Sequence, residues 1–121
     1  MKRCLIVDDS SVIRKVAKRI LAGPEMLVAE AASAQEALNI CAQELPEIIM
    51  ADGSLPDMRS DELIARLMAI DPETKPHILL CLSAVDVGQI MRAKRAGAKG
   101  YLLKPFTRTQ LLESFRELAA A

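Results

Sequence analysis

Five polar side chains of this sequence stand directly after short apolar runs: Asp8, Asp9, Asp52, Ser83 and Lys104. Three carboxylates, a hydroxyl and an ammonium can do chemistry together if the fold brings them to one place. Crowded carboxylates repel one another, so one of them would have to take up a proton unless a cation compensates the charge. Mg²⁺ suits a site with one or two direct carboxylate ligands, water and a phosphoryl ligand. Lys104 would add a mobile positive charge for an incoming anionic oxygen.

Asp52 is the carboxylate with the most unusual position. It ends the apolar run Ile48–Ala51, which has the composition of a buried strand. A carboxylate can accept a phosphoryl group and become an acyl phosphate. Catalysis of that transfer is mostly positioning and charge neutralisation, which a metal ion and Lys104 would supply. Ser83 can donate a hydrogen bond to a phosphoryl oxygen, so these residue types predict a phosphoryl-accepting site at Asp52.

The elements that must position these side chains appear as alternating apolar and amphipathic segments. The apolar runs predict five strands: Cys4–Val7, Met26–Ala29, Ile48–Ala51, Ile78–Leu82 and Tyr101–Leu103. Strands that alternate with amphipathic helices form a parallel sheet covered by helices on both faces. Ligands of such a sheet bind beyond the carboxyl ends of its strands. We therefore expect one doubly wound α/β domain over residues 1–121, with the five polar side chains at one edge of its sheet.

The segments between the strands have helical periodicity, and the six prolines all fall between elements, where proline is tolerated. The expected buried helix positions are Ile13, Val16, Ala17 and Ile20; Ala37, Leu38 and Cys41; Leu63, Ile64, Leu67 and Met68; Ile90, Met91 and Ala93; and Leu111, Leu112, Phe115 and Leu118. Ser10 and Ser11 are candidate caps of the first helix. Residues 33–36 read as a capping box that opens the second. Four basic residues of the first helix predict a solvated face: Arg14, Lys15, Lys18 and Arg19.

Composition excludes several classes of function. Sixteen basic and sixteen acidic side chains cancel, which gives no reason to expect nucleic-acid or anionic-membrane binding. The sequence has neither a signal peptide nor an apolar stretch long enough to span a membrane, so we expect a soluble, cytoplasmic protein. Three cysteines without metal-ligand spacing predict buried, reduced thiols. His77 precedes the fourth strand, at the end opposite the acidic residues, and is expected to be a loop histidine.

Four segments, in this order and spacing, resemble the receiver domain of bacterial two-component response regulators: LIVDDSS, IIMADGSLPDM, LLCLSA and GYLLKPF. The resemblance covers essentially the whole chain and leaves no sequence for an output domain, as in a stand-alone CheY-like receiver. It implies a flavodoxin-like (βα)5 fold with a five-stranded parallel sheet in the order 2-1-3-4-5. It also implies a protein that catalyses only its own phosphorylation and dephosphorylation.

The resemblance assigns roles to the residues at the sheet edge. Asp52 would be the phosphoacceptor, and its donor would be a histidine kinase or a histidine phosphotransfer protein. Asp9 and Asp52 would bind Mg²⁺ directly, with Mn²⁺ as the alternative ion. The backbone carbonyl of Ser54 would be a further ligand, and Asp8 would act through a water molecule.

The remaining implied roles concern switching. Lys104 would contact the phosphoryl group and would precede a cis peptide bond to Pro105. Ser83 would move towards the phosphorylated site, and Tyr101 would turn inward as it moves. A downstream target would bind the face of the fourth helix, fifth strand and fifth helix, about Val87–Leu118. The protein is expected to be a monomer.

Four positions depart from the family pattern or are expected to set the rate of phosphate loss. Arg59 and Ser60 replace the usual acid–glycine turn of the loop after Asp52, which leaves the conformation of that loop open. In this family, the positions two beyond Asp52 and two beyond Ser83 often set the rate of hydrolysis, and here they are Ser54 and Val85. Val85 cannot hydrogen-bond an attacking water, so we hypothesise a long-lived phosphoryl group.

The N-terminal segment is most similar to the chemotaxis branch of the family, and this is the function we expect. A phosphorelay shuttle or a phosphate sink is the alternative, followed by a receiver that binds partners without phosphorylation. An aspartyl-phosphate hydrolase would need a second acid where Ser54 stands and a cap insertion for its substrate. A flavin-binding protein would need a hydroxyl-rich phosphate loop where Asp8 and Asp9 stand, and aromatic rings to hold the flavin.

Overall fold

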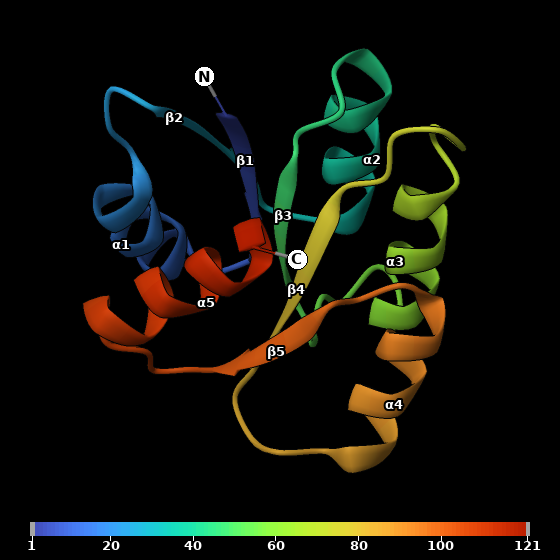
Figure 1. The fold of residues 1–121 in the computed structure, drawn as a ribbon. Coiled ribbons are helices and arrows are strands. Elements are labelled where there is room, and N and C mark those ends of the chain that lie inside the picture. Colours follow the sequence, from blue (N-terminus) through green and yellow to red (C-terminus); the bar gives the residue numbers. More distant parts are fainter. Residues whose placement is uncertain (1, 121) are drawn as a thin grey trace.

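One parallel sheet carries all five expected strands. The structure is a computed structural model that describes residues 2–120. The strands are β1 Lys2–Val7, β2 Met26–Ala31, β3 Ile48–Asp52, β4 His77–Leu82 and β5 Gly100–Leu103. They lie in the order β2-β1-β3-β4-β5, and every paired neighbour is parallel (Figure 1). The flavodoxin-like fold and its strand order are confirmed.

Four helices lie between consecutive strands and a fifth follows β5: α1 Ser11–Leu21, α2 Ala34–Gln43, α3 Ser60–Met68, α4 Val87–Ala96 and α5 Arg108–Ala120. Helices α1 and α5 cover one face of the sheet, and α2, α3 and α4 cover the other (Figure 1). Successive side chains of a strand point to opposite faces. For this reason Leu5 and Ile49 pack against α2 and α3, whereas Cys4 and Ile6 pack against α1 and α5.

Local hydrogen bonds explain where most helices begin. The hydroxyl of Ser10 caps α1 by accepting from the Ile13 N–H, and Asp86 caps α4. At α5, Thr107 Oγ1 accepts from the Gln110 N–H while Gln110 Oε1 accepts from the Thr107 N–H, which is a complete capping box. The predicted box at α2 is partial, because Ser33 accepts from the Glu36 N–H but the Glu36 carboxylate accepts from the Ala32 N–H.

Three helix positions differ from the prediction. Val16 and Met91 are exposed to 44% and 49%, so neither belongs to the core face of its helix. Arg14 does not lie on a solvated face. Its guanidinium contacts the Glu30 carboxylate on β2 at 3.1 Å and donates to the backbone oxygen of Asp8 at 2.6 Å. Because these partners come from other elements, periodicity within α1 alone could not reveal them.

The central strand β3 explains how a carboxylate comes to end an apolar run. All five of its residues are buried, because β1 and β4 flank it and helices cover both faces. Asp52 is its last residue and lies beside Cys81 of β4. The backbone therefore leaves the core at Asp52 itself. Within residues 2–120, no helix is long and apolar enough to cross a membrane.

Candidate functional site

The carboxyl ends of β1, β3 and β5 bring two carboxyl side chains and a lysine together. Asp8 follows β1 directly, Asp52 ends β3, and Lys104 follows β5. The Lys104 Nζ lies 3.0 Å from Asp8 Oδ2 and 3.0 Å from Asp52 Oδ1. Lys104 is 96 positions from Asp8 and 52 positions from Asp52 along the chain. The fold thus produces the cluster that the strand-end argument predicts.

Lys104 compensates the charge of this cluster. Its side chain is 11% exposed, and those of Asp8 and Asp52 are 3% and 2% exposed. Burial disfavours the charged ammonium, but the hydrogen bonds and the Coulombic attraction from both carboxylates outweigh it and raise the pKa of Lys104. The lysine is therefore fully protonated at neutral pH and holds a fixed positive charge beside Asp52.

Local donors orient the two buried carboxylates. Asp8 Oδ1 accepts from the Ser10 N–H at 2.9 Å. Asp52 Oδ1 accepts from both the N–H and the hydroxyl of Ser54, at 3.3 and 3.1 Å. The other oxygen, Asp52 Oδ2, is buried and has no hydrogen-bond partner among the described residues. A buried carboxylate oxygen without a donor is costly, so this atom is a natural ligand for a cation.

Asp9 completes an acidic group that can hold a metal ion. One oxygen from each of Asp8, Asp9 and Asp52 lies within 4.8 Å of the others. Asp9 is exposed, whereas Asp8 and Asp52 are buried, so the cluster opens to solvent at Asp9. Carboxylate oxygens at this spacing are the ligand set of a hard divalent cation, and the unpartnered Asp52 Oδ2 is consistent with such an ion.

A hollow of about 240 Å³ borders Asp52 on the side of β4 and α4. Its lining includes Asp52, Ser54, Ser83 and Gln89. Ser83 is exposed. Val85, two residues further on, is 58% exposed and brings no polar group to this side of the site.

The predicted switch residues Tyr101 and Lys104 belong to β5 and to the position directly after it. The Lys104–Pro105 peptide bond is cis, which is the isomer that the resemblance implies. Tyr101 is 43% exposed and lies on β5, on the same face of the strand as Leu103. The structure therefore has the tyrosine in an outward position.

The loop between β3 and α3 holds contacts that sequence reasoning missed. Asp57 accepts from the N–H groups of Ala34 and Gln35 at 3.1 and 3.0 Å, which anchors the loop to the first turn of α2. These hydrogen bonds lower the pKa of Asp57. Ser60 is buried and is the first residue of α3, and Arg59 before it pairs with Asp61. No local pattern announces the Asp57 contacts, because they span 22 and 23 residues.

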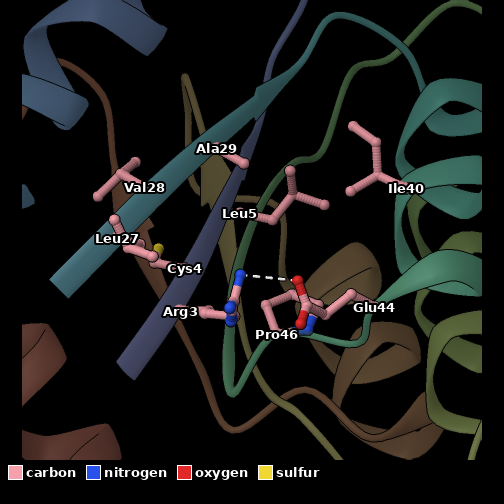
Figure 2. A pocket seen from close by; sticks show the side chains of 9 residues that line it. All are labelled: Arg3, Cys4, Leu5, Leu27, Val28, Ala29, Ile40, Glu44 and Pro46. Carbon is pink, nitrogen blue, oxygen red and sulfur yellow. Dashed lines mark ion pairs between the residues drawn. The ribbon is translucent and has the colours of Figure 1, made fainter. Parts of the chain in front are cut away.

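A second hollow, of about 260 Å³, lies at the amino ends of β1 and β2 and borders α2 (Figure 2). Its lining is mostly apolar, and an ion pair of 2.7 Å between Arg3 and Glu44 lies beside it (Figure 2). None of the predicted site residues lines it. Both charged side chains are about half exposed, at 47% and 60%, so the hollow lacks the convergent buried polar groups of the Asp52 site.

The three cysteines are buried thiols, as expected, although Cys81 lies beside Asp52 in the sheet; His77 lies at the opposite end of β4. All three thiols are free and buried, and burial raises the pKa of Cys41 to about 11. Burial likewise raises the pKa values of Cys4 and Cys81, so all are unreactive thiols at neutral pH. His77 is the first residue of β4 rather than a loop residue, and it is half-buried.

Comparison with known proteins agrees with this geometry. Residues 4–116 match the family model of the response regulator receiver domain. The chain is 32% identical over 120 residues to the chemotaxis protein CheY of Listeria monocytogenes, and the alignment covers 98% of this chain and 99% of that protein. The chemotaxis response regulator CheY4 of Vibrio cholerae superposes with a TM-score of 0.89 at 27% identity over 98% of both chains. A CheY-like receiver domain protein of Methanospirillum hungatei gives a TM-score of 0.90 at 30% identity, covering 99% of this chain and 95% of that one.

Proposed function

The chain belongs to the response regulator receiver domain family, and we propose that it is a phosphorylation switch of chemotaxis-type signalling in the cytoplasm. The observation that carries the proposal is the Lys104 Nζ, which bridges Asp8 and Asp52 at 3.0 Å from each carboxylate. An ammonium in that position neutralises charge where a phosphoryl group would add more. The similarity to chemotaxis proteins supports the pathway.

In the proposed reaction Asp52 is the nucleophile. One of its carboxylate oxygens forms a bond to the phosphorus of a phosphohistidine, and the bond from phosphorus to the imidazole nitrogen breaks. Lys104, which keeps its proton at neutral pH, attracts the phosphoryl oxygens. The backbone N–H of Ser54 already points at Asp52, so it can donate to the product without reorganisation.

The acidic cluster fits Mg²⁺, with Mn²⁺ as the alternative. Asp9 and Asp52 would be direct ligands together with the Ser54 carbonyl, and Asp8 would bind through water. When bound, the ion supplies positive charge that lowers the repulsion between the carboxylates and an incoming phosphoryl group. The protein catalyses only its own phosphorylation and dephosphorylation.

The donor, a histidine kinase or a histidine phosphotransfer protein, is proposed to dock on α1. Val12 and Val16 are exposed to 68% and 44% on that helix, which begins beside Asp8 and Asp9. Lys15 and Arg19 are exposed on the same helix and would attract an acidic surface. Helix α1 packs beside α5, so this surface adjoins the proposed target face.

The downstream target is proposed to bind α4, β5 and α5, about Val87–Leu118. Exposed apolar side chains gather on α4 and β5: Val87 at 66%, Met91 at 49%, Tyr101 at 43% and Leu103 at 39%. Phosphorylation would draw Ser83 towards Asp52, and Tyr101 would turn inward and change this surface. A target that binds the two forms with different affinity then shifts the population between them.

Affinity capture with the wild-type chain, Asp52→Asn and Tyr101→Ala tests the proposal. A flagellar motor component retained by the phosphorylated wild type, and less well by both variants, supports chemotaxis. Capture of only histidine phosphotransfer proteins would favour the alternative, a phosphorelay shuttle or a phosphate sink. Equal capture by phosphorylated and unphosphorylated chains would contradict a switch. It would favour a receiver that binds partners without phosphorylation.

A further inference from the structure

Gln89 lines the hollow beside Asp52 and links α4 to α3 and to the loop after β3. It lies in the first turn of α4, three residues after the capping residue Asp86. Its side-chain Nε2 is 2.6 Å from the backbone oxygen of Gly53 and 3.0 Å from Ser60 Oγ. A backbone carbonyl can only accept, so the amide nitrogen of Gln89 must face it. We call this set of contacts the Gln89 bridge.

The bridge acts on the peptide group next to the reacting carboxylate. The Gly53 oxygen and the Ser54 N–H belong to one planar peptide unit. The Ser54 N–H donates to Asp52 Oδ1, and the Gly53 N–H donates to the Cys81 oxygen at 2.8 Å. Gln89 therefore holds the opposite side of the peptide whose N–H points at Asp52. Rotation of that peptide unit would break the Gln89 hydrogen bond and, at the same time, turn the Ser54 N–H away from Asp52.

Gly53 and Ser60 each provide something that the Gln89 bridge needs: space for the amide and a second acceptor. A Cβ on Gly53 would lie 2.7 Å from Gln89 Nε2 and 2.6 Å from a methyl carbon of Leu82, so only glycine admits the amide at this distance. Ser60, which replaces the glycine usual at this position of the family, gives the amide a second acceptor. The serine at position 60, where this chain differs from the family pattern, is therefore hydrogen-bonded to Gln89 of α4.

We propose that Gln89 is a positioning residue for phosphoryl transfer to Asp52. This inference rests on the proposed function. An Asp52 oxygen bonds to phosphorus while the bond from phosphorus to the leaving group of the donor breaks, and the leaving group departs with the electron pair. Charge on the phosphoryl oxygens must then be met by donors that are already in place. Gln89 keeps the Ser54 N–H in place, and it lines the same hollow as Asp52 and Ser83.

The first test compares phosphorylation rates of the whole chain with acetyl phosphate and Mg²⁺. Gln89→Met keeps the length of the side chain and removes the donor, and Gln43→Met, on the exposed end of α2, is the matched control. We expect Gln89→Met to be slower by about tenfold, which is less than the loss of a whole oxyanion donor because the Ser54 N–H remains. The control should match the wild type within about twofold.

A spectroscopic readout separates positioning from stability. In metal-free protein, Gln89→Met should shift the Gly53 carbonyl carbon and the Ser54 amide proton, which report on the two ends of one peptide unit. Ser60→Ala keeps the Gly53 contact and should slow the reaction less than Gln89→Met. Gln89→Glu, which places an acceptor against the Gly53 oxygen, should also slow the reaction and serves if Gln89→Met does not fold.

The outcomes distinguish the inference from the function on which it rests. Slow phosphorylation of a folded Gln89 variant, with both resonances shifted, supports positioning. A Gln89 variant that is phosphorylated at the wild-type rate overturns the inference and leaves the proposed function intact. A Ser60→Ala effect as large as that of Gln89→Met overturns the route through Gly53. Failure of the wild type and the Gln43→Met control to gain phosphate, from acetyl phosphate and also from a phosphohistidine donor, would instead overturn the proposed function.

Discussion

Lys104→Met removes the charge that holds the acidic cluster together. The wild-type ammonium bridges two carboxylates that are 3% and 2% exposed, at 3.0 Å from each. Removing one partner of a buried ion pair costs about 3–5 kcal/mol because a buried charge is left uncompensated. The lysine itself is nearly buried, and its own desolvation is relieved in the variant. We therefore expect a loss at the lower end, about 3 kcal/mol in the free energy of unfolding.

A divalent cation should restore much of this loss. Mg²⁺ bound to the same carboxylates compensates the same charge, and a ligand that binds only the folded state stabilises it by mass action. Urea unfolding near neutral pH, in EDTA and in saturating Mg²⁺, measures both effects. The gap between Lys104→Met and wild type should shrink in Mg²⁺. Lys99→Met, which removes an exposed lysine, is the control and should change little.

The pH dependence gives a second check on Lys104. Its folded-state pKa is raised, so its contribution is complete below the ordinary value of 10.5 and is lost as the pH rises through the higher folded value. Wild-type stability should fall in that alkaline range more steeply than that of Lys104→Met. A stability loss below about 1 kcal/mol, with an unchanged response to Mg²⁺, would refute the view that Lys104 compensates the cluster.

Three further predictions concern residues around the site. Val85→Glu should speed the loss of phosphate from Asp52, because the new carboxylate can orient an attacking water; phosphate release after removal of the donor measures this, and slower release would contradict it. Asp9→Asn should weaken Mg²⁺ binding at least about tenfold, since Asp9 is a proposed ligand, while unfolding changes by less than about 0.5 kcal/mol because the residue is exposed. Calorimetric titration with Mg²⁺ and urea unfolding check the two parts. Asp57→Ala should lose about 1 kcal/mol because it removes the acceptor of both helix N–H groups. Because the folded-state pKa of Asp57 is lowered, its contribution is present above the ordinary value of 3.8 and is lost as the pH falls below it, so acid unfolding curves of variant and wild type should converge.

The strand ends could be predicted because they follow from short-range patterns and one general rule. Apolar runs located the strands, and the carboxyl-edge rule placed Asp8, Asp52 and Lys104 together before any distance was known. Local caps such as Ser10 were visible for the same reason. Assignment of the strand order required the family resemblance, because alternation of strands and helices admits several orders.

Contacts between distant segments could not be predicted in this way. Arg14 pairs with Glu30 on another element, and Asp57 caps a helix 22 residues earlier. Gln89 reaches Gly53 across 36 residues, and its type and spacing within α4 are those of an ordinary exposed glutamine. The prediction that Met91 is buried was wrong for a related reason. An apolar side chain on a helix fits a core face or a partner-binding face equally well.

Intact mass of the chain after incubation with acetyl phosphate tests the central claim most directly. The wild type in Mg²⁺ should gain one phosphoryl group. The same chain in EDTA, and Asp52→Asn in Mg²⁺, should gain none, because the reaction needs both the cation and the Asp52 carboxylate. A gain in Asp52→Asn equal to that of the wild type would move the acceptor elsewhere. No gain in the wild type, from acetyl phosphate or from a phosphohistidine donor, would contradict the account.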